Sequence, residues 1–551
     1  MPDQESTRAS GASASDPAAP ALSGARQGAD TSGLPAPPAE LAPAQVLRLY
    51  PPHDGTLGGA LTARAQIRPE HDFIVYQDQR ISYAQALALQ EAYARMLQRL
   101  GVRAGDKVGV MSLSHPSTVF LLFALARLGA VLVPVNPQYQ AAEARYIFEN
   151  AEVVGVFCSP ELLDTVRSAV QGLPATPWVI LNEPGGEARS IDAMLDDAAG
   201  SPVQSQGAPS DVCIFIYTSG TTGYPKGVMH SQYSLITAGE GFVERMHLQP
   251  ADRQLCILPL FHINAIFYSL MGSLAAGCTL ILEPRFSASQ FWQVVKRTGA
   301  TAVNTIAAAN TILMSRPASE FEPGHALRKV YGAPFDENIH AHFRNVFQVP
   351  TLIEGYGMSE IPGVLSNPFE GPHKICCMGK PCRHPLHEAP LAEVMVSDDE
   401  GRALPVGEIG ELAVRTPIIM KGYYKLPEQT ASAFRNGWFL TGDLAYQDAD
   451  GYFWFVARKK DIIRRRGENI SGAELDRVLG AHPDIFEAAA IGVPSELGEE
   501  DILAVVVPRA GARLTPPDVA AWCRERLAAI KVPRYVVFAE SLLHTPTHRV
   551  A

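Results

Sequence analysis

Short apolar runs alternate with helical segments over residues 107–220, and this alternation limits the possible folds more than any other feature of the chain. Segment 117–130, which lies between two of the runs, has the apolar spacing of a helix. Apolar strands that alternate with helices are typical of a mostly parallel sheet covered on both faces. We therefore predict an α/β fold whose ligands bind beyond the carboxyl ends of the strands. The predicted strands are 107–113, 131–136, 153–159, 178–182 and 212–220.

The chain has 551 residues, which is too long for one domain, and we divide it into three parts. Residues 1–42 are rich in Ala, Ser, Gly and Pro, so they cannot bury enough apolar surface to fold, and we predict a disordered tail. Residues 43–458 form the predicted large domain, with mixed and parallel sheets covered by helices. Residues 459–551 form the predicted small α+β domain. Its expected elements are helices from about Ala473 and over 516–530, the latter capped by Thr515, and strands over 487–493 and 502–508.

The net charge and the spacing of the cysteines limit the possible ligands and the possible cellular location of the protein. A formal net charge of −11 argues against nucleic-acid and anionic-membrane binding, because phosphate attraction needs an excess of Lys and Arg. The eight Cys have no disulfide-like spacing, which indicates a reducing compartment. No apolar run follows the first ten residues, as a secretory signal would require. We expect a cytoplasmic protein, and a homodimer is one possible assembly.

Segment 257–282 carries no Asp, Glu, Lys or Arg and is long enough to span a bilayer. Polar and helix-breaking residues from Pro259 to Gly277 interrupt it. They favour the alternative, a buried helix that leads into a buried strand.

The segment "YTSGTTGYPKGV" (217–228) follows a predicted buried strand. Glycines let backbone N–H groups approach a ligand closely, hydroxyl groups donate hydrogen bonds, and Lys226 adds positive charge. The pattern differs from a Walker A loop, because Lys226 lies between Pro225 and Gly227. Composition alone leaves two readings open, an anion-binding loop and a flexible linker.

Three further blocks follow this loop: "YGMSE" (356–360), "GWFLTGD" (437–443) and "ARKKDIIRRRGENISGAELD" (457–476). Together, in this order and at this spacing, the four blocks resemble the adenylate-forming superfamily of acyl-CoA synthetases, peptide-synthetase adenylation domains and luciferases. The resemblance covers the chain from about residue 46. Ser359 replaces the usual Thr of its block, and Ala457 replaces the usual Gly. Segment 259–292 looks most like the crotonobetaine/carnitine-CoA ligase branch.

The resemblance implies a site for ATP and Mg2+. Glu360 would ligate Mg2+, and Ser359 would contact the α-phosphate. Asp443 would accept hydrogen bonds from the ribose hydroxyls, with Arg458 in support. The alternatives are a solvated acid for Glu360 and plain core packing for Tyr356. The remaining implied ligands are Thr218, Ser219, Gly220, Thr221, Thr222, Gly223 and Lys226 for the phosphates, and Gly332, Ala333, Pro334, Tyr356 and Gly357 for the adenine.

The resemblance also implies a site for the acid and the thiol. His262 would be an aromatic gate between the carboxylate pocket and the entry of the thiol, although a lone His in an apolar stretch is more often a core residue. Phe261, Asn264 and Ala265 would line the acyl pocket. Lys460 would lie at the hinge on which the small domain swings, and Gly467 beside the pantetheine arm of coenzyme A.

Two charged or metal-like clusters have simpler explanations. The run Arg464–Arg466 is usually a solvated face, although it would also suit the phosphates of coenzyme A. The Cys and His residues of segment 373–387 lack the paired spacing of zinc ligands, so we expect structural cysteines there.

The implied function is an AMP-forming acyl-CoA ligase, an acid–thiol ligase that activates a small or medium carboxylic acid and transfers it to coenzyme A. The pattern departs from the family at its end, where Arg549 of "TPTHRVA" occupies the position of the usual catalytic Lys. Arg is also positive, but it is a planar fork and not a compact ammonium. Two alternatives therefore stay open, a nucleotide-binding relative with impaired catalysis and an adenylating enzyme that loads a carrier protein.

Overall fold

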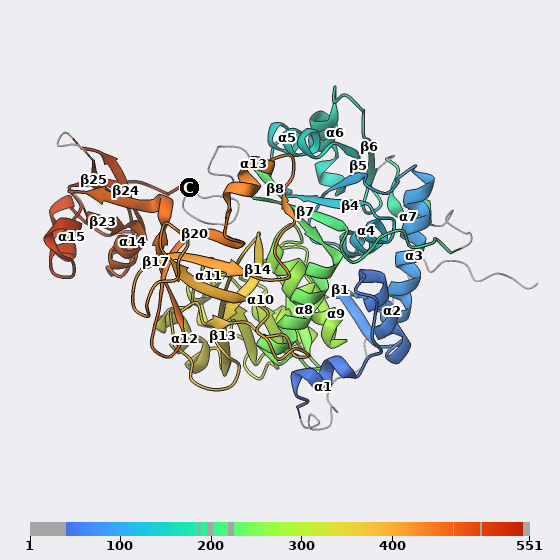
Figure 1. The fold of residues 1–551 in the computed structure, drawn as a ribbon, viewed down its shortest axis with the longest axis horizontal. Helices are drawn as coiled ribbons and strands as arrows, with labels where there is room; N and C mark the ends of the chain where they lie inside the picture. The colour runs from blue at the N-terminus through green and yellow to red at the C-terminus, as the bar shows by residue number, and fades with distance from the viewer. Residues whose placement is uncertain are drawn as a thin grey trace, which may run out of the picture.

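The computed structural model describes residues 40–185, 188–195, 202–218, 225–466, 468–495 and 499–543. The predicted tail, apart from its last three residues, lies outside this part of the chain. In this part of the chain, nine strands form one large sheet in the order β15-β14-β13-β12-β11-β9-β10-β1-β2 (Figure 1). The six strands in the middle of this order, from β13 to β1, are parallel to one another. The strands are β1 (Asp72–Tyr76), β2 (Gln79–Ser82), β9 (Arg253–Cys256), β10 (Thr279–Leu282), β11 (Ala302–Asn304), β12 (Lys329–Gly332), β13 (Thr351–Met358), β14 (Ile361–Ser366) and β15 (Lys380–Pro381).

Among the described residues, seven more strands form a second sheet in the order β18-β8-β7-β4-β3-β5-β6. Strands β3 to β7 pair in parallel, whereas β7, β8 and β18 pair antiparallel. The predicted strands of this sheet are thus confirmed: each begins at the predicted residue and ends one or two residues before the predicted end. The strands are β3 (Lys107–Met111), β4 (Val131–Val135), β5 (Val153–Cys158), β6 (Trp178–Leu181), β7 (Val212–Thr218), β8 (Lys226–Ser231) and β18 (Gly422–Tyr423).

Helices cover both faces of the seven-stranded sheet. The main core joins one face of this sheet to the nine-stranded sheet through α3, α4 and α8, and a second core packs α5 and α6 on the other face. The helices of the large domain are α1 (Pro43–Arg48), α2 (Leu57–Ile67), α3 (Tyr83–Arg99), α4 (Pro116–Arg127), α5 (Ala141–Ala151), α6 (Leu163–Val170), α7 (Ile191–Leu195), α8 (Gln232–Met246), α9 (Met271–Ala276), α10 (Phe291–Thr298), α11 (Ala307–Met314), α12 (Glu337–Asn345) and α13 (Pro427–Ser432).

The apolar segment 257–282 is buried in the main core. It forms a π-helical segment, Asn264–Leu270, which continues as α9 and then enters β10. This confirms the reading as a buried helix that leads into a strand. In the part of the chain that the structure describes, no helix is both long and apolar enough to cross a membrane.

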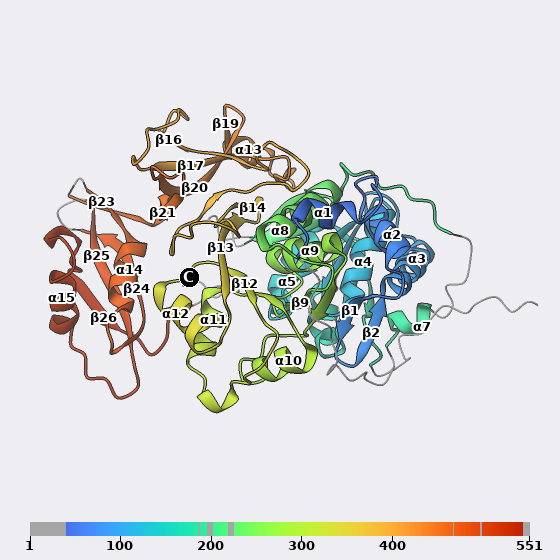
Figure 2. The same ribbon diagram turned by 90° about the horizontal axis from the view of Figure 1, so that it is seen from below.

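A third sheet links the large sheets to the small domain (Figure 2). It contains β16 (Glu393–Ser397), β17 (Gly410–Arg415), β19 (Phe434–Arg435), β20 (Trp438–Gln447) and β21 (Phe453–Arg458). The small domain has its own apolar core and lies to one side of the molecule (Figure 1). Its elements are β22 (Ile462–Arg465), β23 (Glu468–Ser471), α14 (Gly472–Gly480), β24 (Ile485–Pro494), β25 (Glu500–Pro508), α15 (Pro516–Arg524) and β26 (Tyr535–Phe538).

Helix α15 is shorter than predicted, because it ends at Arg524 and not near residue 530. The N–H groups of Arg526 and Leu527 both donate to the carbonyl oxygen of Cys523, and Ala528, with ψ of 146°, leaves the helical conformation. Pro533, which cannot continue a helix, then leads the chain into β26.

A half-buried carboxylate on α8, that of Glu240, holds two distant segments against the main core. The two oxygens of Glu240 accept hydrogen bonds from His53, at 3.3 Å, and from His384, at 3.1 Å. Burial alone would raise the pKa of Glu240, but the hydrogen bonds and charge of the two histidines outweigh it and lower that pKa from 4.5 to about 2. The folded-state pKa is depressed, so the stabilisation is present above pH 4.5 and is lost as the pH falls toward 2.

We expect Glu240→Gln to lower the free energy of unfolding at pH 7 by about 1–3 kcal/mol. The amide NH2 group of Gln cannot accept a hydrogen bond, so one of the two histidines would lose its acceptor. The difference between variant and wild type should shrink below pH 4.5, where the wild-type carboxyl also becomes protonated as the chain unfolds. Urea unfolding followed by fluorescence at several pH values measures both effects. Glu400→Gln, at a side chain that is 64% exposed, is the matched control. Equal stability at pH 7, or a difference that grows in acid, contradicts this account.

Candidate active site

Most of the residues predicted to bind phosphate belong to the β7–β8 hairpin. Thr218, the last residue of β7, pairs with Lys226, the first residue of β8. Ser219, Gly220, Thr221, Thr222 and Gly223, which connect the two strands, lie outside the described residues. The Nζ atom of Lys226 lies over the ring of Tyr423, 5.2 Å from its centroid. The hairpin thus places the lysine beside β18 of the same sheet.

Tyr423 joins this lysine to the predicted metal ligand. Its hydroxyl donates a hydrogen bond of 2.8 Å to Oε1 of Glu360. Glu360 is only 7% exposed, so it is not a solvated loop acid. Burial raises the pKa of Glu360, and the hydrogen bond from Tyr423 and the charges of Arg458 and Lys226 oppose that rise. One tyrosine therefore positions a cation and an anion of the predicted site.

His230 on β8 fixes the backbone next to Glu360. Its Nε2 donates a hydrogen bond of 2.6 Å to the carbonyl oxygen of Ser359, and its Nδ1 lies 3.3 Å from the hydroxyl of Ser234. Burial lowers the pKa of His230 to about 4, so the imidazole is neutral near pH 7 and carries its proton on Nε2. This contact positions Ser359, which sequence analysis places at the α-phosphate.

The predicted ribose ligand is buried and has a spare acceptor. Asp443 is 3% exposed, and its Oδ2 accepts a hydrogen bond of 2.6 Å from the hydroxyl of Tyr356. Nε of Arg458 lies 3.2 Å from Oδ1, close enough for an ion pair but without the alignment of a hydrogen bond. Among the described residues, no donor bonds to Oδ1. Tyr356 therefore does more than fill the core, and the carboxylate can accept a further hydroxyl group.

The predicted adenine turn, Gly332 to Pro334, follows β12. A Cβ atom at Gly332 would lie 2.7 Å from the carbonyl oxygen of Thr305, so only glycine fits there. Glu354 holds the far side of the turn, because its Oε1 accepts the N–H groups of Phe335 and Cys376, each at 3.2 Å. The sequence analysis missed Glu354, although an acid inside an apolar strand signals a buried carboxylate with specific partners.

The predicted gate and acyl-pocket residues lie in the loop after β9 and at the start of the π-helical segment. His262 and Phe261 are half-buried, with ring centroids 4.3 Å apart. Asn264 is the first residue of the π-helical segment, and Ala265, the second, is buried. These residues lie at the carboxyl end of a parallel strand, where ligands of such sheets bind.

Three predicted residues, the hinge Lys460, Gly467 of the thiol site and Arg549 of the first step, stay untested. Gly467 and Arg549 lie outside the described residues, and so does the side chain of Lys460. The neighbouring Lys459 pairs with Asp399 at 2.9 Å and with Glu411 at 3.1 Å, which ties the start of the small domain to the third sheet.

The Arg464–Arg466 run is not one solvated face. Arg465 is 8% exposed and pairs with Asp501 at 3.1 Å, in addition to its bonds to two backbone carbonyl groups. Its guanidinium is therefore part of the small-domain core. Only the two flanking arginines are exposed.

Cys377 and His384, in the Cys- and His-rich segment 373–387, have partners within the protein. The thiol of Cys377 lies 3.0 Å from the carbonyl oxygen of Lys374, and His384 binds Glu240. All eight cysteines of the chain fall in the described part and are free thiols.

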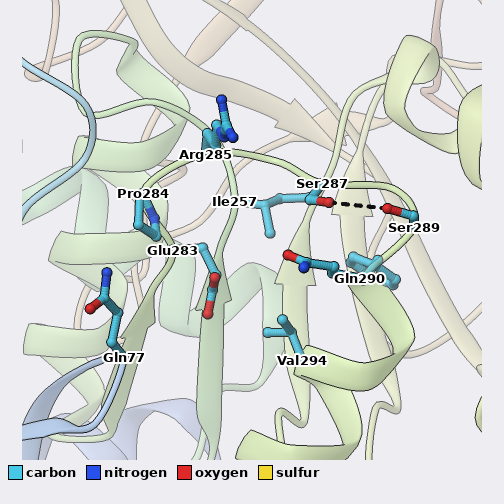
Figure 3. A pocket seen from close by; sticks show the side chains of 10 residues that line it. Gln77, Ile257, Glu283, Pro284, Arg285, Ser287, Ser289, Gln290 and Val294 are labelled. Carbon is cyan, nitrogen blue, oxygen red and sulfur yellow. Dashed lines mark hydrogen bonds between the residues drawn. The ribbon is translucent and has the colours of Figure 1, made fainter. Parts of the chain in front are cut away.

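A polar cavity of about 370 Å³ opens beside the candidate site, at the carboxyl ends of β1, β9 and β10 (Figure 3). Glu283, Pro284 and Arg285 follow β10, and Ser287 to Val294 lead into α10. None of the residues predicted to bind ATP lines this cavity. It shares the ligand-binding edge of the nine-stranded sheet but is separate from the Asp443–Glu360 region.

Comparison with known proteins assigns the chain to a family. The model for AMP-binding enzymes matches residues 61–424, and the model for the AMP-binding enzyme C-terminal domain matches residues 474–549. The chain belongs to the AMP-binding enzyme family. Its relatives are named CoA ligases, which confirms the resemblance to acyl-CoA synthetases and the predicted acid–thiol ligase class.

Two relatives and one solved structure illustrate the similarity. A probable CoA ligase of Humulus lupulus is 33% identical over 90% of this chain and 95% of its own. A crotonobetaine/carnitine–CoA ligase of Salmonella paratyphi A is 32% identical over 80% of this chain and 86% of its own. The crystal structure of ATP-bound MatB from Rhodopseudomonas palustris has a TM-score of 0.79 at 27% identity, over 93% of this chain and 97% of that chain.

We expect Tyr423→Phe to slow ATP-dependent pyrophosphate release roughly 10- to 100-fold, because a buried carboxylate loses a hydrogen bond. The ring under Lys226 remains in this variant, so Tyr423→Leu, which removes both contacts, should be slower still. The Mg2+ concentration for half-maximal rate should also rise in Tyr423→Phe, whereas a purely structural defect would lower the amount of active protein and leave this concentration unchanged.

Tyr424→Phe is the matched control. The hydroxyl of Tyr424 donates to Glu152 at the surface, and its loss should change neither the rate nor the Mg2+ requirement. Full activity of Tyr423→Phe would show that this tyrosine does not position Glu360.

Proposed function

We propose that the protein is an AMP-forming acyl-CoA ligase that activates a small or medium carboxylic acid with ATP and transfers it to coenzyme A. The observation that carries the proposal is the spare acceptor of Asp443. A buried carboxylate oxygen without a donor is costly, and a bound hydroxyl group would remove that cost. Asp443, with two acceptor oxygens beside Arg458, suits the vicinal hydroxyls of a ribose.

The other groups suit the phosphates of the same nucleotide. Lys226 would meet the phosphates from the β7–β8 hairpin, and Ser359 would meet the α-phosphate. Glu360 is a carboxylate of the kind that Mg2+ prefers. When bound, Mg2+ would supply positive charge that offsets the negative charge of the phosphates. The turn from Gly332 to Pro334 would take the adenine, against Tyr356.

The reaction would proceed in two steps. The carboxylate of the acid attacks the α-phosphorus of ATP, forming a mixed anhydride with AMP and releasing pyrophosphate. The thiolate of coenzyme A then attacks the carbonyl carbon, and AMP leaves. The protein contributes position and charge, which are the main sources of catalysis in such transfers. The small domain would swing on a hinge at Lys460 between the steps, with His262 as the gate for the thiol and Gly467 beside its arm.

The test is a panel of carboxylic acids given to the purified protein with ATP, Mg2+ and coenzyme A. Pyrophosphate release and thioester formation are measured separately, with an Asp443→Asn variant beside the wild type. We expect at least one acid to support both steps, and Asp443→Asn to weaken ATP binding. ATP binding without pyrophosphate release for any acid would instead support the relative with impaired catalysis. Pyrophosphate release without a free thioester would support the loading of a carrier protein.

We expect Arg549→Lys to raise the rate of pyrophosphate release severalfold, because a compact ammonium can approach both the carboxylate and the phosphate. The second step does not use this residue, so the rate of thioester formation from a preformed acyl-adenylate should stay unchanged. Single-turnover measurements of each step separate the two effects. A slower first step in the variant would show that this chain is adapted to arginine.

A further inference from the structure

A line of hydrogen-bonded side chains runs through the apolar core beneath the predicted acid pocket. Nε2 of Gln254 donates to Oδ1 of Asn304 at 3.0 Å, and Nδ2 of Asn304 donates to Oδ1 of Asn264 at 2.9 Å and to the hydroxyl of Ser269 at 3.0 Å. We call these four residues the amide chain. Gln254, Asn304 and Ser269 are fully buried, whereas Asn264 is only half-buried. The amide chain therefore leads from the core to an open end at Asn264.

On one side, the amide chain adjoins the predicted adenine turn. Asn304 is the last residue of β11 and pairs with Tyr331 of β12. The next residue, Thr305, donates its N–H to the carbonyl oxygen of Tyr331 at 2.8 Å, and its own carbonyl oxygen closely approaches Gly332. Asn304 thus lies directly beside the turn where the nucleotide base would bind.

On the other side of the amide chain, the π-helical segment that begins at Asn264 adjoins the predicted α-phosphate site. Phe267, in the π-helical segment that begins at Asn264, has its ring centroid 4.9 Å from that of His230. His230 in turn holds the carbonyl oxygen of Ser359. The π-helical segment therefore links the base side of the site with its phosphate side. A carboxylate that attacks the α-phosphorus must lie in this region.

The hydrogen bond from Asn304 sets the orientation of the Asn264 amide. Because Oδ1 of Asn264 is the acceptor, its Nδ2 is left to donate elsewhere. No hydrogen bond from this Nδ2 is found within the described ranges of the chain. Ala265, Ile266 and Phe267, which follow, are buried and apolar. π-Helical turns occur frequently at functional sites, and Asn264 is the first residue of this one.

We propose that Asn264 donates a hydrogen bond to an oxygen on the chain of the carboxylic acid, so that the enzyme selects a small acid bearing a hydroxyl, ether or carbonyl oxygen over a plain alkyl acid. This inference rests on the proposed function and names its substrate class. Asn264 is a specificity residue in this account, and Gln254 and Asn304 are positioning residues that act through it.

The expected selectivity follows from the cost of an unpaired polar group. A purely apolar pocket separates acids that differ by one methylene group by about 10- to 200-fold in kcat/KM and favours the better space filler. A pocket with a fixed donor rejects an acid that lacks the acceptor, because the donor then loses its water and gains no partner. Replacement of one CH2 group by an ether oxygen changes little in shape and adds only an acceptor.

The test compares matched pairs of straight-chain acids and ether acids of equal length, in pyrophosphate release by the full-length protein with ATP and Mg2+. We expect one ether position to raise kcat/KM about tenfold or more over its alkyl partner. Asn264→Leu should abolish this preference. Asn264→Asp, which keeps the shape and the bond from Asn304 but presents an acceptor, should reverse it.

Asn345→Leu and Asn345→Asp, at an exposed position that ends α12, are the matched controls and should leave the preference unchanged. The unfolding midpoint of each variant shows whether it is folded, and the near-isosteric Asp variant keeps the test valid if the Leu variant is not. Pyrophosphate release with equal or greater preference for alkyl acids at every length overturns this inference and leaves the proposed function intact. Absence of pyrophosphate release with all acids overturns the proposed function itself.

Discussion

The candidate site depends on the contact that holds the turn between β13 and β14 against the seven-stranded sheet. His230 supplies it, with a neutral imidazole that donates to the carbonyl oxygen of Ser359. A charged imidazole at this buried position would need an anion beside it, whereas the neutral ring needs only the hydroxyl of Ser234. Tyr423 reinforces the contact from β18 of the same sheet through Glu360. The two large sheets are thereby joined where the predicted phosphate ligands come from both.

Buried carboxylates fall into two kinds here, and their free oxygens separate them. Glu354 has a donor to each oxygen, with two backbone N–H groups at Oε1 and Asn367 at Oε2, so its role is complete without a ligand. Asp443 has a donor to Oδ2 only. Native proteins seldom leave buried polar atoms without a hydrogen bond. Because Asp443 lies beside Arg458 and Tyr356, which are also predicted to contact the nucleotide, a bound hydroxyl group is the explanation we favour for its Oδ1.

Local patterns predicted the elements well, because they need no knowledge of distant contacts. The apolar runs predicted β3 to β7. Gly332 came instead from the family resemblance, and the close carbonyl of Thr305 explains why a glycine stands there. Partners across the fold were not predictable in this way. Tyr423 is 63 residues from Glu360, and only the pairing of β18 with β8 brings them together. Arg465 was read as part of a charged run because its partner Asp501 lies in another strand.

Two polar atoms of the candidate site that accept or donate no hydrogen bond among the described residues have complementary chemistry. Asp443 offers an acceptor, Oδ1, and Asn264 offers a donor, Nδ2, and both are attached to the same frame: Asp443 through Tyr356 of β13, and Asn264 through Asn304 of β11. A ligand with hydroxyl donors at one end and an oxygen acceptor at the other satisfies both at once. An adenylate of a polar acid has this form, with the ribose hydroxyls on the AMP part and the oxygen on the acyl part. In the proposed reaction, the adenylate would be the one molecule that carries both groups, so it would contact Asp443 and Asn264 at the same time, whereas ATP and the acid would each contact only one of them.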